Sequence, residues 1–298
     1  MFKKRKVLKI IGIIFVVLLA IGGVYVYSVY QSAKNALDNA YIPIEREREA
    51  DIKNEPFSVL LLGIDLDEGR DTGRSDTMMV VTVNSDQKSS NILSIARDTR
   101  VDIVGHGTVD KINHAYAFGG AQMAVDTVQN FLDIPIDFYV EIDMDGFMTL
   151  VDIVGGVTVE NDLEFSQSGY DFPIGTLHLE SSSEVLAFVR MRYNDPRGDF
   201  GRQERQRDVL EALVNEMATY AVTRYQDIFD TLGDNMKTNM EMSDLISISL
   251  NHNSAMGTFN QMELRGSGQR IDNIYYQIIS PEELLETQRI LKEHLELQ

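Results

Sequence analysis

The sequence predicts an αβα-like α/β fold, in which a central mixed β-sheet is covered by helices and preceded by one N-terminal transmembrane helix. Short apolar runs of strand length stand close together at residues 57–64, 77–84 and 91–96. Segments with helical apolar spacing, such as 114–131 and 201–224, alternate with further strand-like runs. We see no long-period repeat and no linker that would divide the chain after its first 55 residues.

The N-terminal region predicts a membrane anchor. Five lysines and arginines fall within residues 1–9, and residues 10–30 carry no charged side chain. That apolar run is long enough to span a bilayer core of about 30 Å, and the preceding positive charge predicts a cytoplasmic tail. A cleaved signal peptide is the alternative, but the run is long and no small-residue cleavage motif follows it closely. We therefore expect a stalk at residues 31–55 and an extracellular domain at 56–298.

Composition excludes several classes of function. The formal net charge of −19 argues against a nucleic-acid-binding protein that works through a general positive field. The absence of cysteine excludes disulfides, thiolate metal sites and a cysteine nucleophile. There is no Walker loop, nucleophile elbow or dinucleotide fingerprint, and the five histidines show no ligand spacing.

Acidic and basic residues gather at the predicted strand ends. If the first three strands form an antiparallel meander, Asp65, Asp76 and Arg97 meet at one edge of the sheet, with Arg74 in the loop between. One or two carboxylates, together with substrate phosphates, are what Mg²⁺ usually binds. Turn chemistry is the alternative for these acids. Lys111 precedes a predicted helix and is suited to a phosphate near the helix N-terminus, although a surface lysine explains it equally well.

An arginine-rich segment stands out in this acidic chain, because six arginines fall within residues 188–207. Residues 186–193 are either the end of a helix or a short extended run, and an extended run would place Arg190 and Arg192 on one face. A helix is expected to follow, with its polar face formed by Asp199, Arg202 and Gln206. Guanidinium groups match phosphate oxygens bidentately. Arg205 and Arg207 are equally well explained by salt bridges on a solvated helix.

Several of these motifs, in order and spacing over about residues 57–217, resemble the LytR-CpsA-Psr family of Gram-positive cell-envelope proteins. The matching stretches are residues 73–77 (GRSDT), 94–99 (SIARDT), 111–116 (KINHAY), 145–147 (DGF) and the arginine segment from Val189 to Arg207. The family usually has proline before the Arg-Asp-Thr triplet, where this chain has Ala96. That difference changes the rigidity of the strand end and leaves Arg97 in place.

The resemblance implies a phosphotransferase anchored in the cell membrane. Such a protein moves a glycopolymer, which is a teichoic acid, a capsular or another wall polysaccharide, from a polyprenyl-pyrophosphate carrier to peptidoglycan. The linkage formed is a phosphodiester at a muramic acid hydroxyl. Two alternatives stay open: a hydrolase that splits the lipid pyrophosphate with water, and a non-catalytic envelope regulator that binds lipid intermediates.

The resemblance also implies roles for residues. Asp65 and Asp76 would hold Mg²⁺, and Asp199 is either an orienter of the arginines or a base; we favour the orienter, since a carboxylate among arginines is a poor base. We expect Arg97, Arg190, Arg192 and Asp199 to be the catalytic group. Pyrophosphate oxygens would be held by Arg74, Arg97, Lys111, Arg190, Arg192, Arg202 and Gln206. The candidates to line a lipid slot, each of which taken singly is better explained as ordinary core, are Phe118, Met123, Phe147, Leu150, Val151, Leu186 and Phe188.

Overall fold

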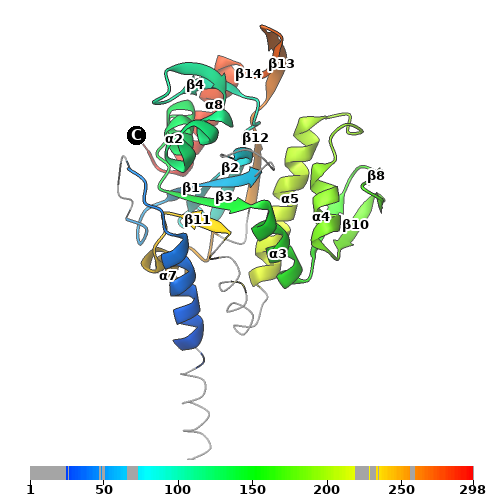
Figure 1. The fold of residues 1–298 in the computed structure, drawn as a ribbon. Coiled ribbons are helices and arrows are strands. Elements are labelled where there is room, and N and C mark those ends of the chain that lie inside the picture. The colour runs from blue at the N-terminus through cyan, green and yellow to red at the C-terminus, as the bar shows by residue number, and fades with distance from the viewer. Residues whose placement is uncertain are drawn as a thin grey trace, which may run out of the picture.

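The computed structural model describes residues 25, 27–46, 48, 51–65, 73–218, 228, 233, 235–255 and 259–297. Residues 27–40 form a helix, drawn in blue at the bottom of Figure 1. The predicted tail and most of the predicted membrane span lie outside the described residues. Within the described part, no helix has the length and apolar character needed to cross a membrane.

A six-stranded mixed sheet forms the centre of the domain, in the order β11-β6-β1-β2-β3-β12. The predicted meander is confirmed, because β1 pairs antiparallel with β2 and β2 with β3. The sheet is mixed because β6 lies parallel to β1 and β12 parallel to β3. The strands are β1 (Phe57–Asp65), β2 (Arg74–Asn84), β3 (Ser89–Ser94), β6 (Phe138–Asp143), β11 (Met236–Thr238) and β12 (Phe259–Glu263).

One face of the sheet is covered by α2 (His114–Leu132) and α8 (Pro281–His294) (Figure 1). Alternate side chains of the strands point into this layer, where Leu60, Leu62, Met78, Val80 and Leu93 are buried. Helix α8 begins as predicted, with Ser280 accepting from the Glu283 amide and proline at the first turn. Beside this layer lie two hairpins, β4 (Arg100–Ile103) with β5 (Thr108–Lys111) and β13 (Gly266–Ile271) with β14 (Ile274–Ile279).

The other face carries a second helical layer with its own core. It contains α3 (Met144–Val154), α4 (Ser182–Arg190) and α5 (Asp199–Ala218), which Figure 1 shows side by side. Small hairpins cover this layer, namely β7 (Val157–Asn161) with β10 (Gly175–Leu179) and β8 (Phe165–Gln167) with β9 (Tyr170–Phe172). Helix α7 (Met242–Asn251) completes the chain between β11 and β12.

The second face of the sheet is incompletely covered. Leu61, Val81, Val140 and Ile142 are only partly buried there, whereas the alternate residues that face α2 and α8 are buried. Gly63 lies in the same row, and an added Cβ would approach Thr77 Cβ to 3.0 Å. Leu61 pairs with Val140 and Gly63 with Ile142 across β1 and β6, and Gly63 also pairs with Thr77, the residue after Asp76. We call Leu61, Gly63, Val81, Val140 and Ile142 the sheet strip.

Some predicted boundaries need correction. The second strand begins at Arg74 rather than Thr77, and the third covers residues 89–94 rather than 91–96. Helix α5 begins at Asp199, as expected from the polar face, and two residues before the segment 201–224 that was predicted from apolar spacing. The β4–β5 hairpin was not predicted, because its short strands are largely polar and are held by tertiary contacts rather than by their own pattern.

Candidate functional site

A β-bulge positions Asp76 at the end of the sheet. Thr77 pairs with Gly63 and Ser75 pairs with Ile64, so Asp76 has no partner across the β1–β2 ladder. A bulge of this kind redirects a side chain away from its regular position. The Asp76 carboxylate accepts a hydrogen bond from Arg97 Nη1 at 2.6 Å, just after β3. The expectation that these strand ends meet at one edge is confirmed.

The β5–α2 connection adds a second cation to this edge. Lys111 Nζ lies 2.6 Å from Asp98 Oδ1, and Arg97 Nε lies 4.0 Å from Asp98 Oδ2. The Asn113 side-chain amide donates to Asp76 Oδ1 at 3.4 Å and immediately precedes α2. The positive N-terminal end of α2 therefore begins beside the same carboxylate.

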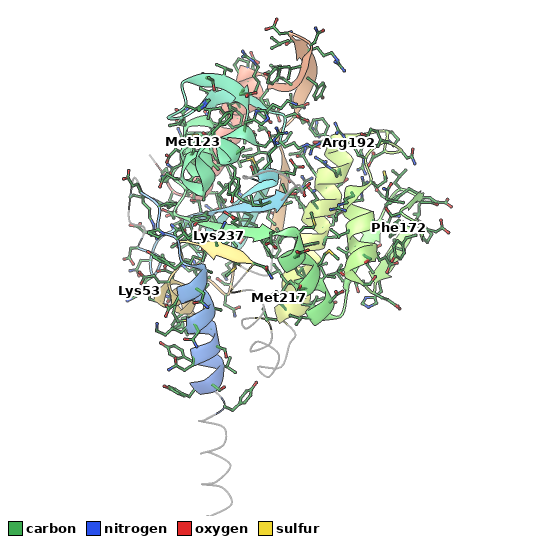
Figure 2. The ribbon with its side chains drawn as sticks, viewed as in Figure 1. Lys53, Met123, Phe172, Arg192, Met217 and Lys237 are labelled. Atoms are coloured by element: carbon green, nitrogen blue, oxygen red, sulfur yellow. The ribbon has the colours of Figure 1, made fainter. Side chains whose placement is uncertain are left out.

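The start of α5 supplies the opposite side of the site. Asp199 Oδ1 lies 2.7 Å from Arg202 Nη2 and 3.5 Å from Arg192 Nε. Asp199 Oδ2 accepts from Gln203 Nε2 at 2.9 Å. Figure 2 shows Arg192 at the upper end of α5, with Met217 at the lower end of that helix. Both carboxylate oxygens of Asp199 are thus engaged by neighbouring cations or amides.

The two sides share one electrostatic environment. Burial lowers the pKa of Arg97, but the carboxylates of Asp76, Asp98 and Asp199 outweigh it and raise that pKa overall. Burial also lowers the pKa of Arg202, and repulsion from Arg97 and Arg192 adds to that effect against the attraction of Asp199. Arginines from the loop after β3, the α4–α5 connection and α5 are therefore close enough to repel one another, which favours an anionic ligand between them.

Several buried polar atoms at this edge lack a hydrogen-bond partner among the described residues. They include Arg202 Nε, Ser75 Oγ and Asn113 Oδ1. Buried polar groups are nearly always paired in folded proteins, so a cluster of unpaired ones indicates a ligand site. We call the set Asp76, Arg97, Lys111, Arg192, Asp199 and Arg202 the arginine clamp.

The other predicted phosphate-binding residues lie around the clamp. Gln206 is half-buried and lies one turn beyond Arg202 on α5. Arg74 is exposed, and its backbone lies opposite Asp65 in the β1–β2 ladder. Arg190 is exposed at the C-terminal end of α4, with no ion pair to a described carboxylate. The helix-end alternative for residues 186–193 is therefore the correct one, and the extended-run alternative is wrong.

The seven predicted lipid-slot residues do not lie together. Phe118 and Met123 belong to α2 on the first face of the sheet, where the Phe118 ring is 44% exposed and stacks on His106 at 4.0 Å. The other five are in the core of the second helical layer, where Val151 and Phe188 are fully buried. The sheet strip, which was not predicted, presents partly exposed apolar side chains on β1, β2 and β6.

Two residues that sequence reasoning left out support the start of α5. Asp195 is buried, and its Oδ2 accepts from Arg205 Nη1 at 2.7 Å. Burial raises the pKa of Asp195, but hydrogen bonds from Arg205 and from the Arg197 backbone lower it overall. Gly201 is required because a Cβ there would lie 1.8 Å from Asp195 Oδ2. Arg205 is therefore a structural arginine.

The acidic residues of the site fit a hard cation shared with a ligand. Among the described residues, no cluster of three or more His, Asp or Glu side chains could enclose a metal ion. Asp65 and Asp76 stand at neighbouring strand ends and are both partly exposed. Arg97 and Asn113 leave further lone pairs free on Asp76. Two carboxylates of this kind match Mg²⁺ that completes its coordination with phosphate oxygens and water.

Comparison with known proteins gives consistent matches along the chain. A sequence profile of the LytR_cpsA_psr family matches residues 24–293. A polyisoprenyl-teichoic acid–peptidoglycan teichoic acid transferase TagU from Enterococcus faecalis is 47% identical over 302 residues, which cover 99% of each chain. The crystal structure of Bacillus subtilis TagU is 41% identical, with a TM-score of 0.67 over 82% of this chain and 99% of that one. TagT bound to LIIa-WTA is 33% identical, with a TM-score of 0.73 over 85% and 95% of the two chains.

Proposed function

The chain belongs to the LytR-CpsA-Psr family, and from this premise we propose that it transfers a teichoic acid from a polyisoprenyl-pyrophosphate carrier to peptidoglycan. The observation that carries the proposal is the arginine clamp, in which Arg97, Lys111, Arg192 and Arg202 form ion pairs with the clamp residues Asp76 and Asp199 and with the neighbouring Asp98. The buried, unpaired Arg202 Nε is a donor available to a phosphate oxygen.

The reaction requires one phosphorus–oxygen bond to form and one to break. An acceptor hydroxyl of peptidoglycan attacks the phosphorus that carries the polymer. The phosphoanhydride bond breaks, polyprenyl phosphate leaves with the bridging oxygen, and the departing phosphate takes up the hydroxyl proton. Phosphoryl transfer depends mainly on positioning and charge neutralisation, and the clamp is suited to both.

We assign the clamp residues by their position. Arg97, Arg192 and Arg202 bind the pyrophosphate oxygens, and Lys111 adds a point charge at the end of α2. Arg74, Arg190 and Gln206 lie further out and contact the phosphates or the first sugars. Asp199 acts as an orienter rather than a base, because Arg192 and Arg202 form ion pairs with its Oδ1 and Gln203 donates to its Oδ2.

Asp65 and Asp76 would hold Mg²⁺. The ion would neutralise charge on the pyrophosphate oxygens when it is bound there. Asp76 also orients Arg97 through their 2.6 Å hydrogen bond, so one carboxylate serves both the metal and the guanidinium. Removal of divalent cations with a chelator is expected to abolish transfer, and added Mg²⁺ is expected to restore it.

The sheet strip is the proposed path of the lipid chain, because it is apolar and partly exposed, and its Gly63 pairs with Thr77, the residue after Asp76. Residues 10–30 would hold the domain at the outer membrane surface, within reach of a membrane-bound donor. Val140→Arg is expected to remove co-purifying or added lipid donor while far-UV circular dichroism is unchanged. Ile174→Arg is the matched control, because Ile174 lies between β9 and β10, outside the sheet strip, and is 67% exposed. Equal donor retention in both variants would exclude this path.

The test of the proposed function uses the full-length protein in detergent. We would incubate it with a short-chain polyprenyl-pyrophosphate-linked teichoic acid precursor, Mg²⁺ and a peptidoglycan oligosaccharide, and look by mass spectrometry for the phosphodiester product. Product that requires the acceptor supports the transferase. Release of polyprenyl phosphate without an acceptor would indicate the hydrolase instead. Bound donor without turnover would indicate the non-catalytic regulator.

A further inference from the structure

A polar cavity of 620 Å³ lies beside the clamp, between α5, β12 and the start of α8. Its volume falls in the range of about 300–1,000 Å³ that is typical of ligand pockets. No role in the proposed transfer has been given to it. The side chains that line it are Arg197, Phe200, Glu204, Arg207, Gln261, Glu263, Arg265 and Glu283.

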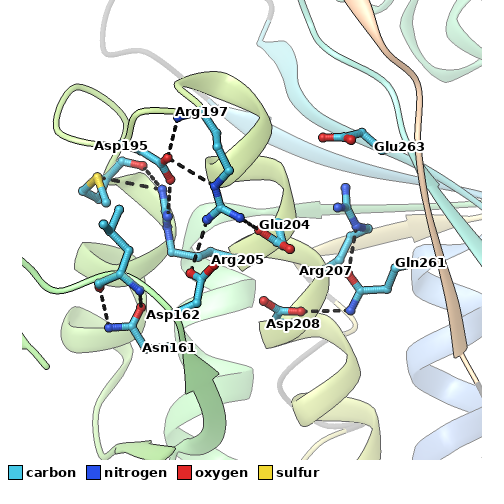
Figure 3. Close-up of polar contacts among 12 residues, drawn as sticks. Asn161, Asp162, Asp195, Arg197, Glu204, Arg205, Arg207, Asp208, Gln261 and Glu263 are labelled. Atoms are coloured by element: carbon cyan, nitrogen blue, oxygen red, sulfur yellow. Dashed lines mark hydrogen bonds and ion pairs between the residues drawn. The ribbon is translucent and has the colours of Figure 1, made fainter. Parts of the chain in front are cut away.

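Arg207 is the unusual member of this lining. The residue is 4% exposed, yet its guanidinium forms no ion pair with a described carboxylate. Its hydrogen bonds go to neutral groups, from Nε to Gln261 Oε1 at 3.1 Å and from Nη1 to Ser94 Oγ at 3.0 Å. Figure 3 shows the guanidinium directed from α5 toward β12, with Glu263 nearby but not bonded to it.

Burial lowers the pKa of Arg207, against the attraction of Glu204, Asp208 and Glu263 at longer range. Gln261 is itself fixed, because its amide nitrogen donates to Asp208 Oδ1 at 2.9 Å. A buried guanidinium without an ion-pair partner is costly unless a ligand supplies the missing anion. The geometry of Arg207 therefore favours a ligand carboxylate or phosphate in the cavity.

The remaining charges decide which ligand fits. Glu204, Glu263 and Glu283 line the same cavity as three arginines. A polyanion such as a teichoic acid chain would meet three repelling carboxylates there. A peptide that carries both carboxylates and amino groups would find partners of both signs. This composition favours the stem peptide of peptidoglycan over the donor polymer.

Distance also favours the acceptor. Ser94, which accepts from Arg207, is three residues before Arg97, so their Cα atoms are separated by at most about 10 Å. Arg207 itself follows Gln206 on the helix that carries Asp199 and Arg202. An acceptor held in the cavity by its peptide could therefore present a sugar hydroxyl at the clamp.

We infer that this cavity is the acceptor subsite, in which Arg207 binds a carboxylate of the peptidoglycan stem peptide. The inference rests on the proposed function, since it assigns the acceptor of that transfer. At the opening, Arg197 is paired with Glu204, and Arg265, which is 77% exposed, is paired with Glu263 at 3.0 Å, so Arg207 is the lining arginine without an ion pair to a described carboxylate. The glutamates receive the amino groups of the peptide.

The test measures binding directly and needs no turnover. By calorimetry, the full-length protein in detergent is titrated with a soluble muropeptide disaccharide, and then with the same disaccharide after its peptide has been removed. We expect the peptide-bearing fragment to bind more tightly. Arg207→Met is expected to weaken it about tenfold, which is what loss of one hydrogen bond to a charged group produces. Binding of the stripped disaccharide is expected to stay unchanged.

Controls separate a binding role from a structural one. Arg207→Lys keeps the charge and should recover part of the affinity, and Arg289→Gln, on the exposed face of α8, should match the wild type. If Arg207→Met fails to fold, Arg265→Gln at the rim gives the same comparison. Equal affinity for both fragments in the wild type would overturn the inference, as would unchanged binding in folded Arg207→Met.

The transfer assay distinguishes this inference from the proposed function. Transfer that proceeds with the same acceptor KM in wild type and Arg207→Met would leave the function standing and overturn the subsite. Loss of donor retention in Arg207→Met, with muropeptide binding unchanged, would give the cavity to the donor polymer instead. Absence of any transfer would count against the proposed function, and the calorimetry would still report on the cavity.

Discussion

Two arginines on α5, three residues apart, have opposite surroundings. Arg205 is buried, bonded to Asp195 and to the Met191 carbonyl, and packed over the Phe165 ring at 5.4 Å. The Nε atoms of both arginines are buried without a hydrogen-bond partner, but Arg202, which pairs with Asp199, lies near two other arginines that repel it. The charge of Arg205 is balanced by Asp195. The arrangement around Arg202 leaves positive charge uncompensated, which a binding site for an anion requires.

The difference shows that the two faces of α5 carry arginines with different roles, one structural and one for ligand binding. Positions 201, 205 and 209 face the core of the second helical layer, and positions 199, 202 and 206 face the end of the sheet. Substitutions on the two faces should therefore affect different properties. Core-face changes should lower stability, whereas clamp-face changes should lower activity and leave stability intact.

The largest expected effect is the loss of the buried pair. Arg205→Met leaves the Asp195 carboxylate buried without its main partner, and breaking such a pair costs about 3–5 kcal/mol. Urea unfolding followed by circular dichroism measures the change. Arg197→Met is the matched control, because Arg197 contacts the same carboxylate from a partly exposed position. Similar losses in the two variants would contradict the structural role of Arg205.

A clamp substitution should instead affect catalysis. Arg97→Gln removes the guanidinium bonded to Asp76, and loss of one preorganised donor lowers kcat by about 10²–10³. Product formation is followed by mass spectrometry, and unfolding by urea. Arg100→Gln, on β4, serves as the control. A large loss of stability in Arg97→Gln, with activity per folded molecule unchanged, would remove Arg97 from the clamp.

The pH dependence of stability should also show the structural role of the Asp195–Arg205 pair. The pKa of Asp195 is lowered in the folded protein, so its stabilising contribution is complete at neutral pH. That contribution is lost as pH falls below about 4, where the unfolded carboxyl takes up its proton first. Unfolding free energies measured between pH 6 and pH 3 should fall less steeply in Asp195→Asn than in the wild type. Parallel curves would show that Asp195 contributes nothing to acid stability.

The smallest expected effect concerns Ala96, the residue before the Arg-Asp-Thr triplet. No backbone hydrogen bond from the Ala96 amide is found among the described residues, and its carbonyl accepts from Thr99 in a turn. Ala96→Pro should therefore stabilise the protein by about 0.4–1 kcal/mol through the unfolded state. Thermal unfolding checks this. A lower melting temperature would mean that the strand end does not accept proline geometry.

Much of this arrangement could be predicted from the sequence. The meander follows from three apolar runs with polar connections, and it brings Asp76 to Arg97 without further information. The shared face of Asp199 and Arg202 follows from helical spacing. The bulge at Asp76 and the close approach of Gly201 to Asp195 depend on tertiary geometry, which no local pattern records.

The residues predicted to line a lipid slot show what an apolar sequence pattern cannot distinguish. An apolar residue on a helix reads the same whether it packs in a core, as Phe188 does, or lies on a partly open surface. The sheet strip, our proposed lipid path, was not predicted because alternation along β1 is weak: both of its faces are apolar, and they differ by the partial exposure of Leu61, Gly63 and Asp65. The exposed packing of Phe118 on His106 likewise depends on the unpredicted β4–β5 hairpin.

Ligand-induced thermal stabilisation of Arg202 and Arg205 variants tests the central claim most directly. Full-length protein in detergent would be melted with and without a short-chain polyprenyl pyrophosphate and Mg²⁺. We predict that the ligand raises the melting temperature of the wild type. Arg202→Gln should melt near the wild-type temperature without ligand and show no shift with it, and Arg205→Lys should melt lower and still show the shift. A full ligand shift in Arg202→Gln, or a large loss of its intrinsic stability, would contradict the account.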